Sequence, residues 1–97
     1  MEYEKRFVEV LAYFDEDGRI YPKKLKWKDY KSKDPAERAE EHPDETIFVI
    51  GKILDVQPRA SLKAGGQGLR YSCIIDGKEK HLFLEDNRWF VEAKIQP

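Results

Sequence analysis

Cysteine, histidine and long apolar runs are scarce in this sequence of 97 residues. The single cysteine, Cys73, excludes an internal disulfide, and its place within an apolar run indicates a buried side chain rather than a reactive thiol. The two histidines, His42 and His81, lie far from each other and from Cys73, without the spacing of metal ligands. No apolar run approaches the roughly 20 residues that span a membrane. We therefore expect no metal, no cofactor and no membrane partner.

The features of a leader sequence are missing as well. The first ten residues, MEYEKRFVEV, lack the basic flank and the apolar core of a signal peptide, which favours a cytoplasmic location. A chain of this length forms one small domain, residues 1–97, with a thin core and little room for a deep active-site cavity. One cysteine in an apolar run and two unrelated histidines form no local triad signature, so we expect a protein that is not an enzyme.

A net charge of −1 excludes strong overall attraction to nucleic acid, yet the charges are segregated along the chain. Seven basic residues and one acidic residue lie between Arg19 and Lys33. Six acidic residues and one basic residue lie between Asp34 and Glu45. Two interpretations remain open: a basic surface patch, or neighbouring segments whose charges cancel.

Runs rich in β-branched and aromatic residues, separated by short turn sequences, fill most of the chain. The dipeptides Asp17-Gly18, Asp76-Gly77 and Asp86-Asn87 are typical of tight turns between antiparallel strands. Alternating or continuous apolar runs predict strands over residues 6–14, 19–27, 46–56, 69–75, 78–85 and 88–95. The sequence therefore predicts an all-β fold: a small, strongly bent antiparallel barrel, SH3-like or OB-like, with about six strands.

Proline and glycine refine this prediction at three places. Pro22 cannot donate to a strand ladder, so its strand is expected at a sheet edge or only after the proline. Gly51, in the middle of the clearest strand, indicates a bulge or a bend. Residues 57–68 are expected to form a long irregular loop.

Residues 31–45 are predicted to form a charged insertion that contains a short helix near residues 34–42. Asp34 is a suitable N-cap, Pro35 a suitable first helical residue, and Glu37 completes the spacing of a capping box. Pro43 ends the helical pattern.

The glycine-rich stretch SLKAGGQGLRY, residues 61–71, admits several interpretations. The tripeptide Gly-Gly-Gln is shared with peptide release factors, which use it to hydrolyse an ester, but their further flanking residues are absent. Lys63 precedes the glycines, and a strand follows them, so the stretch matches neither a P-loop nor a dinucleotide fingerprint. A weak anion nest and a plain connection between strands both remain open.

Basic and aromatic residues suggest a binding surface made of the second strand and the glycine-rich loop. Lysines alternate with apolar residues from Lys24 to Lys28, beside Tyr21, Trp27 and Tyr30. The residues expected to bind are Lys24, Lys26, Lys28, Arg59, Lys63, Gly65, Gly66, Gly68, Arg70 and Tyr71. The alternative is that Trp27 and most other aromatic side chains belong to the core.

The order of these motifs resembles a family of short uncharacterised bacterial proteins. The shared pattern is carried here by Phe14, Asp17-Gly18, Pro22 and Trp27, then by KILDV, ASLKAGGQGLRY, IIDGKEKHLF and RWFVE. Members are often encoded near Y-family translesion DNA polymerases, so the resemblance implies an accessory role in DNA damage tolerance. Relatives have a shorter turn in place of SKDPAERAEEHPDE, which implies that this segment is an insertion.

Three functions are consistent with these patterns. The first is a non-enzymatic binding module whose partner is DNA or a DNA-handling protein. The second is a protein-interaction adaptor that binds an extended peptide or a polymerase. The third is ester hydrolysis through Gln67 of the Gly-Gly-Gln tripeptide.

Overall fold

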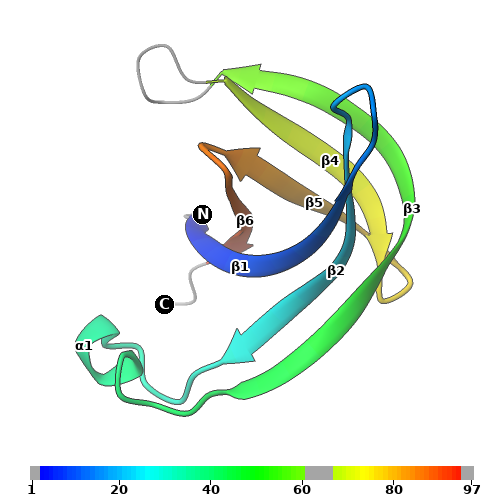
Figure 1. Cartoon of the computed structure of the whole chain (residues 1–97). Coiled ribbons are helices and arrows are strands. Elements are labelled where there is room, and N and C mark those ends of the chain that lie inside the picture. Colours follow the sequence, from blue (N-terminus) through cyan, green and yellow to red (C-terminus); the bar gives the residue numbers. More distant parts are fainter. Residues whose placement is uncertain (1–2, 61–66, 95–97) are drawn as a thin grey trace.

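The computed structural model describes residues 3–60 and 67–94, which form six strands and one short helix (Figure 1). The strands are β1 Tyr3–Phe14, β2 Ile20–Asp29, β3 Asp44–Ala60, β4 Gln67–Ile75, β5 Lys78–Glu85 and β6 Arg88–Lys94, and the helix is α1 Pro35–Arg38. Each strand pairs antiparallel with the next one, and β1 also pairs with β6, so the sheet closes into a barrel. The predicted all-β barrel of about six strands is confirmed.

Tight turns join the strands where the sequence predicts them. Gly18, between β1 and β2, has a φ of 82°. Asp76 and Gly77, between β4 and β5, have φ values of 54° and 72°, and Asp86 and Asn87, between β5 and β6, have values of 50° and 62°. In the second and third turns, positive φ at both central residues matches the right-handed twist of the flanking strands, which explains why Asp, Asn and Gly stand at these positions.

The prediction for Pro22 was wrong: its strand neither lies at an edge nor starts after the proline. β2 begins at Ile20 and runs between β1 and β3. Pro22 pairs with Ala12 beside a register shift in β1, and the pairing of β2 with β3 starts only at Lys24. The missing N–H therefore falls where β2 has a single neighbour, so the proline is tolerated within an interior strand.

β3 is the longest strand, and it bends along the barrel. Its register against β4 shifts between Ile50 and Ile53, across Gly51, where the sequence predicted a bulge or bend. The irregular loop predicted over residues 57–68 was too long, because β3 continues to Ala60 and β4 begins at Gln67. The sequence placed Pro58 in this loop, but Pro58 is part of β3 and pairs with β4. Within the described part of the chain, β3 has no second neighbouring strand there, so the missing N–H is tolerated.

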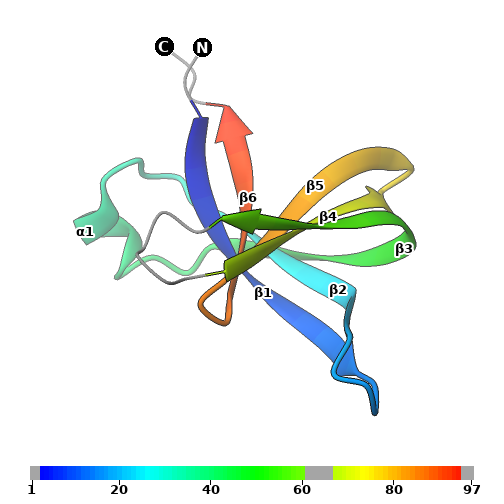
Figure 2. The same ribbon diagram turned by 90° about the horizontal axis from the view of Figure 1, so that it is seen from above.

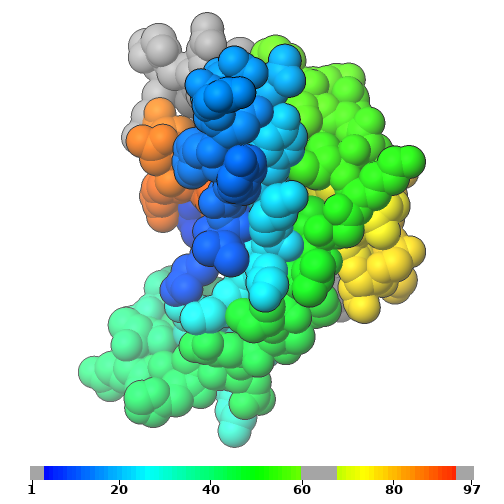
Figure 3. Space-filling model, turned by 45° about the vertical axis from the view of Figure 1, so that its right-hand side comes forward, coloured from blue at the N-terminus to red at the C-terminus, as the bar shows by residue number. Residues whose placement is uncertain are grey.

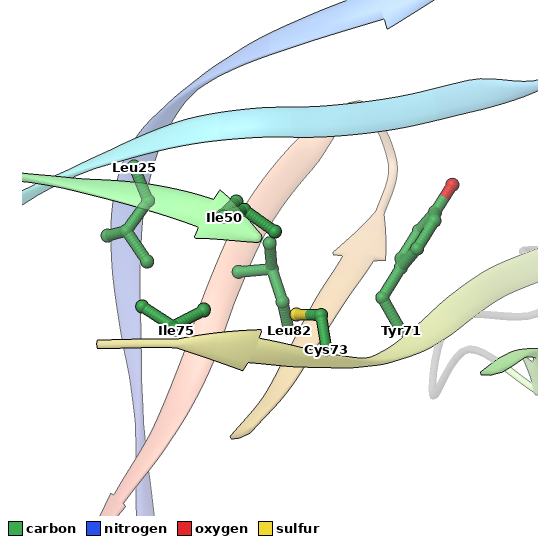
Figure 4. Close-up of a cluster of buried hydrophobic side chains, with 6 residues drawn as sticks. All are labelled: Leu25, Ile50, Tyr71, Cys73, Ile75 and Leu82. Atoms are coloured by element: carbon green, nitrogen blue, oxygen red, sulfur yellow. The ribbon is translucent and has the colours of Figure 1, made fainter. Parts of the chain in front are cut away.

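The core lies within the barrel and is built mainly by β2, β3, β4 and β5 (Figure 4). Its buried cluster comprises Leu25, Ile50, Tyr71, Cys73, Ile75 and Leu82. The hydroxyl of Tyr71 donates to the carbonyl oxygen of Ile20 at 2.7 Å, which satisfies the polar end of a buried ring. Trp27 and Trp89 are partly buried and pack against the cluster, as expected if the aromatic residues belong to the core.

The segment between β2 and β3 projects from one end of the barrel (Figures 1 and 3). The carboxylate of Asp34 accepts from the backbone N–H of Ala36 at 2.9 Å, so the predicted N-cap of α1 is confirmed. The second half of the capping box is different: the N–H of Asp34 donates to the hydroxyl of Ser32, and Glu37 accepts from that same hydroxyl. Ser32, two residues before Asp34, thus makes the bond to the cap N–H that Glu37 makes in a capping box.

Candidate binding cleft

A cleft opens in the barrel wall where β5 and β6 separate. The two strands pair next to their shared turn, at Phe83–Phe90, Leu84–Trp89 and Glu85–Arg88. Beyond these pairs β5 follows β4 and β6 follows β1, and Figure 2 shows the two strands diverging. Among the described residues, Lys78–Leu82 of β5 and Val91–Lys94 of β6 therefore each have one backbone edge without a neighbouring strand.

The cleft has a volume of about 900 Å³ and an apolar floor. The floor is lined by side chains from β2, β3 and β4: Leu25, Trp27, Phe48 and Ile75. Lys78–His81 and Val91–Ala93 form the two walls. Backbone groups without a ladder partner can bond an added strand, and the floor offers apolar burial, so the geometry suits an extended chain.

Two neighbours hold Trp27 in place at the floor. Its ring N–H donates to a carboxylate oxygen of Asp29 at 2.8 Å. The guanidinium of Arg6 lies 4.3 Å from the ring centre and also donates to the carbonyl oxygen of Lys28 at 2.9 Å. These two contacts favour one orientation of the Trp27 ring at the floor of the cleft.

Two lysines of the predicted basic strand are paired with acidic side chains. Glu9 of β1 forms salt bridges with Lys28 at 3.0 Å and with Lys26 at 3.4 Å, and Glu45 of β3 lies 3.5 Å from Lys26. The hydrogen bond from Lys28, followed by that from Lys26, lowers the pKa of Glu9, and the hydrogen bond to Glu9 raises the pKa of both lysines. The charges of Lys26 and Lys28 are therefore largely compensated. Lys24 is exposed and forms no salt bridge with other described residues.

Arg59 and Arg70 lie on another part of the barrel, beside an aromatic pair. The guanidinium of Arg59 is 4.7 Å from the ring centre of Phe83, and Arg70 donates to the side chain of Gln57 at 2.8 Å. Phe83 stacks on Phe90 at 5.0 Å, and both rings are at most 3% exposed. These rings are covered, so they offer no open face to a base. The side-chain partners of the two arginines are Glu92 and Gln57, whereas those of Lys26 and Lys28 are Glu9 and Glu45.

The remaining predicted residues are buried or lie outside the described part of the chain. Tyr71 is 1% exposed and points into the core, so its ring is not on the surface. Gly68 is buried, and a Cβ atom there would lie 2.8 Å from the side chain of Glu85. Close packing therefore accounts for glycine at position 68. The residues outside the description are Lys63, Gly65 and Gly66.

Cys73 and Gln67, the two residues considered for nucleophilic or ester-cleaving chemistry, both lie in β4. Cys73 is fully buried, and this burial raises the pKa of its thiol, which disfavours the nucleophilic thiolate. Gln67 begins β4 and pairs with Ala60. Residues 3–60 and 67–94 hold no group of three His, Cys, Asp or Glu side chains placed to bind a metal. The same residues include no helix long and apolar enough to cross a membrane.

Sequence reasoning missed the cleft, except for Trp27. The stretch KEKHLFLE was interpreted only as a strand, although it contains an available signal. Lys78 and Lys80 lie four and two positions before the buried Leu82, so their side chains are on the same, core-facing side of the strand. Charge on that side indicates that the barrel is open there.

The fold and the cleft define a small, closed, six-stranded antiparallel barrel with a lateral opening. Comparison of the chain with protein families, with curated proteins and with solved structures found no match. The resemblance to a family of short bacterial proteins stays a prediction.

Proposed function

We propose that this chain is a non-enzymatic binding module that takes an extended segment of a partner protein into the β5–β6 cleft. The observation that carries the proposal is the pair of facing strand edges above a floor containing Trp27 and Phe48. Strand addition at such an edge supplies main-chain hydrogen bonds, while alternate side chains reach the floor. The edge Lys78–Leu82 is matched by a segment of about five residues, roughly 16 Å long.

The identity of the partner is open to test. If the resemblance to proteins encoded near Y-family polymerases holds, a DNA-handling protein such as a polymerase is the first candidate. Direct binding of DNA has less support, because Lys26 and Lys28 share Glu9 and the ring of Phe83 is covered. DNA is therefore included as a second arm of the experiment.

A displayed library of random peptides, selected against the immobilised chain, tests the proposal directly. We expect enriched peptides whose binding moves the backbone amide signals of residues 78–82 and 91–93 in NMR spectra. The amides that point to the open edge, about every second residue of these ranges, should also exchange more slowly with solvent in the complex, because strand addition engages them.

Two matched variants locate the binding site. Ala93→Glu places a charge in the cleft wall and should weaken binding by about tenfold or more. Val49→Glu makes the same kind of change at a side chain that is 64% exposed elsewhere, and it should leave binding unchanged. Failure to enrich any peptide over the Ala93→Glu variant, or equal effects of both variants, would overturn the proposal. Salt-sensitive binding of single-stranded DNA without peptide binding would favour a nucleic-acid module instead.

A further inference from the structure

Two lysines on the inner side of the cleft wall lack an acidic partner. Lys78 and Lys80 pair with Ile75 and Cys73 of β4, which are both buried in the barrel. Because cross-strand partners share a face of the sheet, the two lysine side chains leave β5 on the cleft side. Neither lysine forms a salt bridge with any residue in the ranges 3–60 and 67–94.

None of the three acidic residues that line the cleft forms a salt bridge with Lys78 or Lys80. Glu79 occupies the alternate position of β5 and so lies on its outer face. Glu92 already forms a salt bridge of 3.4 Å with Arg59 of β3. Asp76 lies in the turn between β4 and β5. The inner side of the β5 wall therefore carries two lysines that form no salt bridge with the acidic side chains lining the cleft.

We infer that the bound segment carries two acidic residues separated by one position, followed by an apolar residue at the next alternate position. The inference rests on the proposed function of the cleft. A strand paired with β5 repeats every two residues, so acids opposite Lys78 and Lys80 fall on the same face. The next residue on that face lies opposite Leu82, whose side chain is buried in the core, so an apolar side chain suits this position. The partner is thus an acidic–x–acidic–x–apolar segment, in either chain direction.

Three synthetic peptides with the cores Glu-Thr-Glu-Thr-Phe, Gln-Thr-Gln-Thr-Phe and Lys-Thr-Lys-Thr-Phe, each also in reversed order, test this specificity. At low ionic strength we expect the Glu peptide to bind about three- to tenfold more tightly than the Gln peptide, because only the Glu peptide can form two exposed ion pairs with Lys78 and Lys80. The Lys peptide should bind most weakly. The differences should shrink at high salt, because screening acts on exposed charges.

Charge reversal in the protein provides the matched control. The double variant Lys78→Glu/Lys80→Glu should reverse the preference, so that the Lys peptide binds more tightly than the Glu peptide. Lys24→Glu/Lys52→Glu makes the same change in net charge at exposed lysines that do not line the cleft, and it should keep the original order. Equal binding of the Glu and Gln peptides, with no effect of the cleft variant, would overturn this inference but leave the proposed function standing. If neither these peptides nor the library binds, both fall.

Discussion

At the scale of single residues, Gly68 shows how one small side chain allows three strands to approach each other. A Cβ atom at this position would lie 2.8 Å from the Glu85 side chain, 3.1 Å from the Leu84 carbonyl oxygen and 3.3 Å from the Arg59 carbonyl oxygen. Two of these neighbours are backbone atoms of adjacent strands, which cannot turn away. We therefore expect Gly68→Ala to lower the free energy of unfolding by about 1–3 kcal/mol, measured by urea denaturation.

Gly51→Ala is the control for this substitution. A Cβ atom there would meet the Ile74 carbonyl oxygen at 3.4 Å, an ordinary contact, so the free energy of unfolding should change by less than about 1 kcal/mol. Equal stability of Gly68→Ala and the wild type would show that the strands can separate without loss.

The Glu9 carboxylate offers a second prediction at this scale. Its pKa is held below the ordinary value of 4.5 by hydrogen bonds from Lys28 and then Lys26. A carboxylate whose pKa is lower in the folded state than in the unfolded state stabilises the fold at pH values above its unfolded-state pKa. This contribution disappears as the pH falls through its folded-state pKa. We expect a carbon-13 NMR titration of Glu9 to give a pKa below 4.5.

Substitution of the two lysines tests the cause of the shift. Lys28→Met should raise the pKa of Glu9 more than Lys26→Met, because the contact distances are 3.0 Å and 3.4 Å. Lys24→Met, on the same strand, should leave the titration unchanged. A titration of Glu9 that is insensitive to all three substitutions would mean that the salt bridges do not persist in solution.

At the scale of elements, local chemistry decided which predictions held. Strands and turns follow from alternation and from Asp-Gly pairs, which act over a few residues, and they were predicted. The extent of pairing depends on distant strands. β5 has 8 residues and β6 has 7, yet they share only three pairs. The inward-facing Lys78 and Lys80 mark an open side of β5, but the point where pairing ends is set by β4 and β1, which hold the two strands apart. The cleft arises at that point, so it escaped prediction.

The insertion that carries α1 is separable from the barrel. Asp29 and Asp44 are paired at the ends of β2 and β3, so a two-residue turn can join them directly. We expect replacement of residues 30–43 by Asn-Gly to preserve the barrel and the peptide affinity of the cleft. A shorter loop lowers the entropic cost of closure by about 1–2 kcal/mol, so thermal unfolding should occur at the same or a higher temperature. An unfolded product would show that α1 supports the barrel.

At the scale of the whole molecule, closure brings the two ends of the chain together. Tyr3 pairs with Lys94 and Phe7 with Phe90, whereas every other strand pairing joins neighbours in sequence. Contacts between residues so far apart carry the largest loop-closure entropy, so they are expected to form late. The hairpins should form first, because their turns already impose the twist of the strands.

Folding kinetics can separate these two steps. Phe7 packs edge-on against Phe90 at 5.7 Å and lies under Arg88 at 3.6 Å, while Ile75 is buried beside the β4–β5 turn. Phe7→Ala should cost about 1–2 kcal/mol, since this ring is only half-buried, and should act mainly by speeding unfolding. Ile75→Val, at about 1 kcal/mol, should act mainly by slowing folding. Stopped-flow measurements over a range of urea concentrations give both rates. Slower folding of Phe7→Ala with an unchanged unfolding rate would place closure before the hairpins and reverse this order.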